Sequence, residues 1–413
     1  MSADRLWWRI SCCDTRFGQG SIRTSEGVEP ADFLYAWIQS EAISRWAVFQ
    51  IQLAGAYELV EFPLEAHLSQ RSSSAKRWTR RGGKPARDRK PGYFNEMTEL
   101  RLISFLPAAT EMVFALGLAD RLVGVSHECD FPAPAKAKPI VVKPALLLEK
   151  MSLREIDTAV AERVGSGRSL YQVDERLLEQ LAPTHILTQA LCQVCAPSGN
   201  EIAQALAALP VKPKILRFTP HSIAEIFGNL RELGAATGRL AQAEELNAAA
   251  HSRLQNVVEL TKKTSDCPRV LCLEWIDPYY CCGHWVPKMV ELAGGEAALG
   301  HKGADSVRVS WTDIAALSPE ILIVSPCGFG LEEAVVQAKQ LLQQPGWNDL
   351  PAVLNHRVFA VNANAYFSRP GPRVVDGVEL LAHLIHPELC DWRGSQNAFR
   401  KIHFSDILSG PRA

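Results

Sequence analysis

Cysteine and histidine side chains gather in segments that follow predicted strands. Six of them have the chemistry and placement of metal ligands: His127, Cys129, Cys192, Cys195, His284 and Cys327. The Cys192-x-x-Cys195 pair has the spacing of a zinc or redox motif. These residues predict a zinc or iron site or a reactive thiol, and thiols that pack the ends of loops are the structural alternative.

Aromatic side chains are concentrated in the same predicted loops. With one amide, the candidate ligand-binding residues are Phe131, Trp275, Tyr279, Trp285, Phe329, Asn364, Tyr366 and Phe367. Aromatic faces bury apolar ligand surface, and amide or backbone groups orient the ligand by hydrogen bonds. The pattern favours ligand binding by stacking and apolar burial.

Motifs of familiar enzyme classes are missing from the sequence. It contains no G-x-S-x-G, no Walker loop and no G-x-G-x-x-G after a predicted strand. We therefore expect a non-catalytic binding protein that requires no cofactor. A cytoplasmic metal-dependent enzyme or thiol redox protein built on the Cys/His loops is the rival from another class.

The bulk composition limits the partners and the compartment. A net charge of −1 over 413 residues provides no field that would attract nucleic acid. The 11 cysteines form no disulfide framework, and Arg5, Arg9 and Asp14 interrupt any apolar run near the start. These features favour reduced thiols and a cytoplasmic setting. We also expect the protein to be a monomer.

The predicted elements describe an α/β protein. We expect two Rossmann-like lobes with parallel sheets, joined by a long backbone helix, with the ligand cleft between the lobes. Apolar residues at helical spacing continue from Ala241 to Lys262, a rod of roughly 33 Å at about 1.5 Å per residue. The predicted parts are an N-terminal extension at 1–96, an N-terminal lobe at 97–220, linking helices at 221–262, a C-terminal lobe at 263–390 and a tail at 391–413.

In open parallel sheets, ligands bind outside the carboxyl ends of the strands. The loops at 127–132, 189–200, 275–285, 326–330 and 362–370 should therefore face one common cleft.

Four phrases carry a resemblance to a known family. They are RLISFLPAATEMVFALGLADRLVGVSHECDFP, LLEQLAPTHILTQ, VLCLEWIDPYYCCGHWVPKMVELAGGE and NANAYFSRPGPRVVDG. With the rod, they make the chain from about Arg101 to Glu388 resemble the cobalamin-binding and iron-siderophore-binding proteins of ABC importers, the cobalamin branch above all.

This resemblance implies a corrinoid held between two lobes that bend little. It also implies a glutamate on each lobe that docks onto an ABC permease, by position Glu201 and Glu291, and it points Trp275, Tyr279 and the 366–367 pair toward the ligand. Members of the family work in the periplasm or at the cell surface, which stands against the cytoplasmic expectation.

The ligand alternatives are cobalamin (vitamin B12) or a related corrinoid, and an iron chelate or haem. Anionic chelates call for several arginines, and Arg369 and Arg373 are the obvious ones in the loops. Their small number favours the neutral amides of a corrinoid.

Overall fold

The computed structural model describes residues 99–146, 151–189, 206 and 209–402, together with the backbone of three strands nearer the N-terminus. The chain divides into two compact units, Met1–Tyr93 and Phe94–Ala413. In the first unit, an antiparallel sheet is formed by β1 (Trp8–Ile10), β2 (Trp46–Leu53) and β3 (Ala56–Pro63). No helix of the described residues is both long enough and apolar enough to cross a membrane.

The second unit begins with a six-stranded sheet in the order β7-β6-β5-β4-β8-β9. The strands are β4 (Leu102–Ser104), β5 (Leu122–Ser126), β6 (Ile140–Pro144), β7 (Tyr171–Val173), β8 (His185–Thr188) and β9 (Lys214–Arg217). All neighbours run parallel except β7, which pairs antiparallel with β6. The central strand β4 is fully buried, as expected for a strand covered on both faces.

Helices of this N-terminal lobe begin at local sequence signals. They are α2 (Pro107–Ala115), α3 (Leu153–Gly165) and α4 (Glu175–Leu181). Ser152 and Glu155 form a reciprocal capping box at α3, and Asp174 caps α4 by accepting a hydrogen bond from the Leu177 amide. Both starts therefore follow from short local motifs.

The C-terminal lobe contains a seven-stranded mixed sheet. Its path is β13-β11-β10-β14-β15-β16, and β12 also pairs with β10. The strands are β10 (Arg269–Ile276), β11 (Tyr279–Cys281), β12 (Glu296–Ala297), β13 (Val307–Arg308), β14 (Ile321–Val324), β15 (Val358–Val361) and β16 (Phe399–Lys401). Strands β12, β10, β14 and β15 are parallel, whereas β11, β13 and β16 are antiparallel additions.

The helices of this lobe cover the parallel strands. They are α8 (Val286–Leu292), α9 (Trp311–Leu317), α10 (Leu331–Leu341), α11 (Pro351–Leu354), α12 (Ala363–Tyr366) and α13 (Val374–Ile385). Ser310 and Asp313 form a second capping box at α9. We expected a tail from residue 391, but Phe399–Lys401 pairs with β15, so the lobe extends to Ile402.

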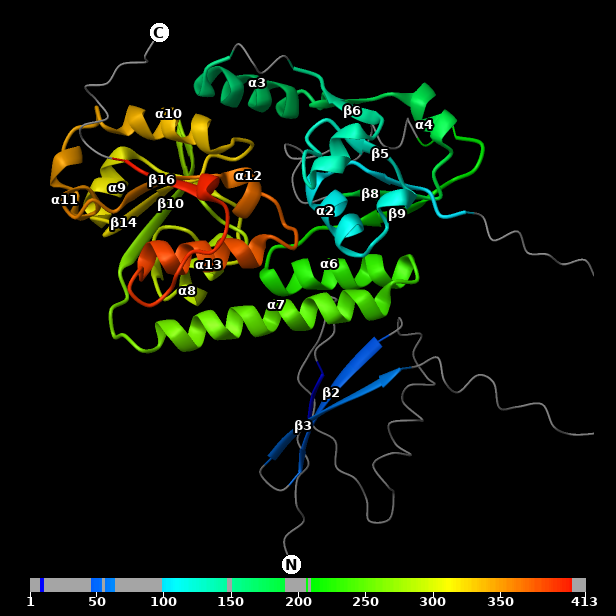
Figure 1. The fold of residues 1–413 in the computed structure, drawn as a ribbon, viewed down its shortest axis with the longest axis horizontal. Coiled ribbons are helices and arrows are strands. Elements are labelled where there is room, and N and C mark those ends of the chain that lie inside the picture. The colour runs from blue at the N-terminus through cyan, green and yellow to red at the C-terminus, as the bar shows by residue number, and fades with distance from the viewer. Residues whose placement is uncertain are drawn as a thin grey trace, which may run out of the picture. The chain divides into compact units, whose positions relative to one another are not determined.

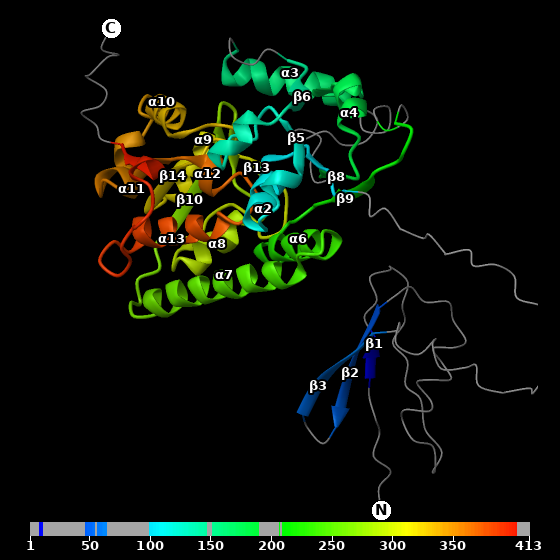
Figure 2. The same cartoon turned by 45° about the vertical axis from the view of Figure 1, so that its right-hand side comes forward.

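Two helices connect the lobes, α6 (Ile223–Ala236) and α7 (Leu240–Thr261). In Figures 1 and 2, α7 runs beneath both lobes. It has 22 residues, so its length is about 33 Å. The predicted two-lobed α/β fold with a long backbone helix is confirmed.

One continuous hydrophobic cluster extends through both lobes and the connecting helices. It joins Met112 of α2, Leu254 and Val257 of α7, Met289 of α8 and Val378 of α13. Because this core does not stop at the lobe boundary, bending the lobes apart would expose buried apolar surface.

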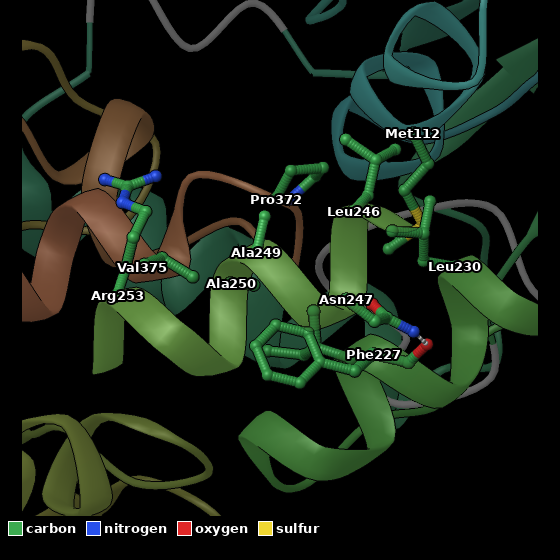
Figure 3. Close-up of a pocket in the computed structure, with 11 residues that line it drawn as sticks. Met112, Phe227, Leu230, Leu246, Asn247, Ala249, Ala250, Arg253, Pro372 and Val375 are labelled. Carbon is green, nitrogen blue, oxygen red and sulfur yellow. Dashed lines mark hydrogen bonds between the residues drawn. The ribbon is translucent and has the colours of Figure 1, made fainter. Parts of the chain in front are cut away.

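A small cavity of about 140 Å³ lies on the helical side of this junction. Figure 3 shows Met112 of α2, Leu230 of α6, Asn247 of α7 and Pro372 around it. The Asn247 amide nitrogen donates to the Phe227 carbonyl at 3.0 Å and ties α7 to α6. The cavity is therefore a feature of the backbone junction, apart from the carboxyl ends of the strands.

Candidate binding cleft

Loops from the two lobes meet at the carboxyl ends of their parallel strands. The loop after β5 carries Asp130, and the loop after α12 carries Arg369. The Arg369 guanidinium pairs with the Asp130 carboxylate at 2.5 Å and donates to the Glu128 carbonyl at 3.1 Å. The expected convergence of these two loops is present.

Glu111 of α2 is the centre of a buried ionic cluster between the lobes. Its side chain is 3 % exposed and receives two hydrogen bonds from Arg373, at 2.8 and 2.5 Å. Arg369 lies 3.7 Å from the same carboxylate. Burial raises the pKa of Glu111, while the two arginines act in the opposite direction.

Phe131 lies against this cluster. The Arg373 guanidinium carbon is 4.0 Å from the centroid of its ring, a cation–π distance, and the residue remains 44 % exposed. One face of the ring is thus occupied by the arginine, and the exposed remainder is available to a ligand.

Helix α3 crosses from the N-terminal lobe toward the C-terminal lobe. Leu153 at its start packs against the apolar cluster of the C-terminal lobe. The Arg154 guanidinium pairs with the Asp277 carboxylate at 2.6 and 3.2 Å. The start of α3, an element of the N-terminal lobe, therefore contacts the C-terminal lobe.

Three of the predicted aromatic residues of the C-terminal lobe make ring contacts near the ends of β10 and β14. Trp275 lies 5.7 Å from Phe329, centroid to centroid, and both rings are partly buried. Tyr279 packs 5.9 Å from Trp311. The Asn364 backbone N–H donates to the Phe329 carbonyl at 3.2 Å and so connects the loops after β14 and β15.

Two predicted ligand residues are core residues instead. Trp285 is 5 % exposed and donates its indole N–H to the Phe367 carbonyl at 2.8 Å, and Phe367 is 2 % exposed. Neither ring offers surface to a ligand, which corrects the prediction for this pair. Tyr366 is partly buried and makes an edge-to-face contact with Trp392, with centroids 5.7 Å apart.

The predicted Cys/His set is not assembled by the described residues. His127 lies beside Tyr171, with ring centroids 6.3 Å apart. Cys129 is buried and accepts a hydrogen bond from Thr110, and the Cys327 amide donates to the Glu274 carbonyl. Cys192 and Cys195 lie outside the described residues.

Burial also makes several thiols poor nucleophiles. It raises the pKa of Cys129 to about 11 and that of Cys272 to about 12, and it raises the pKa of Cys282 well above its ordinary value. Thiolates are the reactive form, so these three side chains are inert packing groups at neutral pH.

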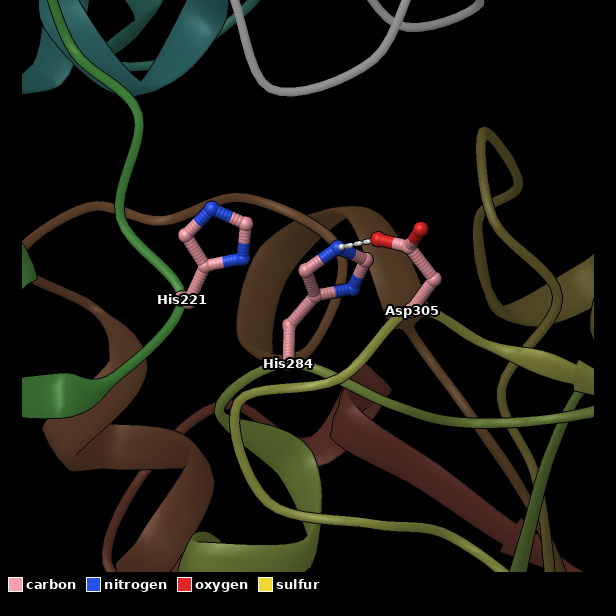
Figure 4. A group of neighbouring side chains, drawn as sticks. All are labelled: His221, His284 and Asp305. Atoms are coloured by element: carbon pink, nitrogen blue, oxygen red, sulfur yellow. Dashed lines mark ion pairs between the residues drawn. The ribbon is translucent and has the colours of Figure 1, made fainter. Parts of the chain in front are cut away.

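A different cluster is formed by His221, His284 and Asp305. The sequence analysis named His284 as a candidate metal ligand but not His221 or Asp305. Among the residues that the structure describes, these three side chains can offer ligand atoms to one ion, all within 4.8 Å of one another. Figure 4 shows the two imidazoles side by side, with the Asp305 carboxylate beside His284. The sequence signal was weak because Asp305 belongs to an irregular segment before β13.

Backbone contacts hold His284 beside Asp305. The His284 amide donates to the Ala304 carbonyl, and the Gly303 amide donates to the His284 carbonyl. A Cβ on Gly283 would lie 2.6 Å from the Asp305 carbonyl carbon, so glycine permits this close approach. Burial lowers the pKa of His284, which favours the neutral imidazole.

Of the two glutamates predicted to dock onto a permease, the structure describes one. Glu291 on α8 is partly exposed and already pairs with Lys302 at 2.7 Å and Lys288 at 3.2 Å. Glu201 lies outside the described residues.

Comparisons with known proteins agree with this architecture. The chain is 23 % identical over 295 residues to an uncharacterized ABC transporter substrate-binding lipoprotein, YvrC, of Bacillus subtilis, covering 70 % of this chain and 80 % of that protein. It is 24 % identical over 284 residues to a vitamin B12-binding protein of Vibrio cholerae, covering 68 % and 86 %. Among solved structures, the periplasmic heme-binding protein RhuT of Roseiflexus sp. RS-1 superposes with a TM-score of 0.53 at 22 % identity, covering 70 % and 98 %.

The profile of a single family extends from the first strand of the N-terminal lobe into α12, over residues 102–365. It includes the N-terminal sheet, the C-terminal sheet except β16, both connecting helices and most of the cleft loops. The chain therefore belongs to the periplasmic binding protein family.

Proposed function

We propose that this protein binds cobalamin or a related corrinoid between its two lobes and serves as the substrate-binding component of an ABC importer. The family supports a binding function, and the resemblance to a vitamin B12-binding protein supports the ligand. Partly buried aromatic rings in the cleft loops, Trp275 and Phe329 in particular, would cover the apolar faces of the macrocycle.

The ion pairs made by the two cleft arginines are the observation that supports a neutral ligand. Arg369 is held by Asp130 and the Glu128 carbonyl, and Arg373 is held by Glu111. An anionic iron chelate needs free guanidinium groups, and these two are already neutralised within the protein. A neutral ligand with peripheral amides fits such a cleft better than a carboxylate-bearing one.

The proposal extends to a permease partner and a place outside the cytoplasmic membrane. On α8, Glu291 is the docking candidate of the C-terminal lobe. A permease arginine would have to replace Lys288 or Lys302 as its ionic partner. The corresponding residue of the N-terminal lobe is Glu201.

Isothermal titration of the full chain with cyanocobalamin, ferric haem and a ferric siderophore tests the ligand class. We expect one equivalent of cyanocobalamin to bind more tightly than the other two. Trp275→Ala should weaken binding about fivefold, because a stacked aromatic contact contributes about 1 kcal/mol beyond its buried area. Leu354→Ala, at a 64 % exposed position on α11, is the control and should leave the affinity unchanged.

Tighter binding of haem or of the siderophore would assign the cleft to an iron compound instead. Binding of none of the three would refute the proposal.

A further inference from the structure

The cluster of His221, His284 and Asp305 has no place in the recognition of a corrinoid by aromatic faces and amides. Two imidazoles and one carboxylate are a donor set for late first-row divalent ions, because imidazole nitrogen suits zinc, nickel and cobalt and carboxylate oxygen completes the coordination. We propose that these three residues form a site for a divalent transition-metal ion of the zinc class.

The distances come close to those of a tetrahedral site. Ligand atoms about 2.1 Å from a tetrahedral zinc ion are roughly 3.4 Å from one another. The His284 Nε2 to Asp305 Oδ1 distance is 3.3 Å. All three ligand atoms lie within 4.8 Å of one another. A modest rotation of the His221 side chain would therefore bring its ring nitrogen to coordination distance.

A buried ring nitrogen of His284 supports the site. The His284 Nε2 is buried and has no hydrogen-bond partner among the described residues, although the Asp305 carboxylate lies near it. A buried polar atom without a partner is costly, and a metal ion at this position would satisfy it.

The surroundings fix two ligands and leave an entry path. Contacts of the His284 backbone with residues 303 and 304 hold that imidazole beside Asp305. The His221 amide donates to the Glu225 carboxylate, which fixes the residue just before the Ser222 cap of α6. The Asp305 side chain is 87 % exposed, so an ion can reach the site from solvent.

The ligands come from different parts of the fold. His221 lies between β9 and α6, at the exit from the N-terminal lobe, whereas His284 and Asp305 belong to loops of the C-terminal lobe. A bound ion therefore links the start of the backbone helices to the C-terminal lobe. Three protein ligands also leave a fourth position open to water or to a donor atom of a small molecule.

The test is zinc binding by the full chain after removal of metals with a chelator and without any corrinoid. Titration calorimetry should give one equivalent of zinc that is lost, or weakened about 100-fold or more, in each of His221→Ala, His284→Ala and Asp305→Asn. His301→Ala is the matched control, because this exposed histidine lies on the same loop as Asp305, and it should bind zinc as the parent does.

Cobalt substitution separates this site from one built on cysteine. Cobalt bound by nitrogen and oxygen lacks the strong ultraviolet charge-transfer absorption of cobalt–thiolate bonds. Thiolate absorption together with loss of binding in a Cys192→Ser, Cys195→Ser variant would overturn the proposal, as would zinc binding that the three substitutions leave intact or no binding at micromolar zinc. A failure of corrinoid binding would leave the zinc result unchanged, since the experiment contains no corrinoid.

Discussion

At the scale of single residues, the ionic cluster around Glu111 connects the lobes most directly. Removing one partner of a buried ion pair leaves the other charge uncompensated. Glu111→Gln keeps the shape of the side chain but leaves the buried Arg373 guanidinium without its charged partner. We therefore expect the free energy of unfolding to fall by about 3 kcal/mol in urea denaturation.

The matched control for this prediction is Glu332→Gln. Glu332 also pairs with an arginine, Arg400, but its side chain is 71 % exposed. Exposed pairs contribute about 0–1 kcal/mol, so this variant should unfold nearly as the parent does. Equal losses in the two variants would show that the buried cluster does not stabilise the junction.

The Cys272 thiol predicts a specific dependence of stability on pH. Its pKa is about 12 in the folded protein, against about 8.5 for a thiol in an unfolded chain. Because the folded state holds the proton more tightly, this contribution is complete below about pH 8.5 and is lost as the pH rises toward 12. The loss approaches about 1.4 kcal/mol per pH unit.

Urea denaturation of the parent and of Cys272→Ala between about pH 8 and about pH 10 measures this effect. The stability of the parent should fall more steeply with pH than that of the variant. Parallel pH profiles would contradict the assigned pKa.

At the scale of elements, the contact between α6 and α7 depends on one small residue. A Cβ on Gly234 would lie 2.7 Å from the Ala243 Cβ and 2.9 Å from the Arg239 carbonyl oxygen, which is backbone and cannot move freely. Gly234→Ala should therefore lower the melting temperature and loosen the backbone helices. The cost of such overpacking is about 1–3 kcal/mol.

Gly228 in the same helix provides the opposite control. It is exposed, and a Cβ there would meet nothing within 4 Å. Gly228→Ala should stabilise the protein by about 0.5–1 kcal/mol through helix propensity. If both substitutions shift the melting temperature in the same direction, the close packing of the two helices is not what decides the outcome.

Elements with strong local signals were predictable from the sequence, and those formed by tertiary contacts were not. The capping boxes at Ser152 and Ser310 are local motifs that mark two helix starts, and the expected rod, Ala241 to Lys262, lies within one residue of α7 at each end. Short edge strands such as β13 and β16 exist only because a neighbouring strand offers them hydrogen bonds. A stretch of two or three residues contains no local pattern that would predict such a strand.

The same distinction applies to the site. Trp275 and Phe329 were assigned from their loops and meet as a pair, but the loop position of Trp285 did not reveal its burial. His221 and Asp305 come together through the packing of distant segments. Sequence spacing alone cannot indicate such a meeting.

At the largest scale, the two lobes of the unit Phe94–Ala413 share one helical support. Helix α7 runs beneath both lobes, and one apolar core continues through them (Figure 1). Wide hinge motion would expose this core, so ligand entry should involve small movements of the loops and of the start of α3, with little change in the backbone helices.

Hydrogen exchange of the full chain with and without saturating cyanocobalamin tests this account most directly. We predict slower exchange in the cleft loops at 127–131, 275–285 and 326–330, and unchanged protection in α7. Unchanged exchange in all three loops, or a marked ligand-dependent loss of protection in α7, would contradict the claim that a corrinoid binds between two lobes on a rigid helical backbone.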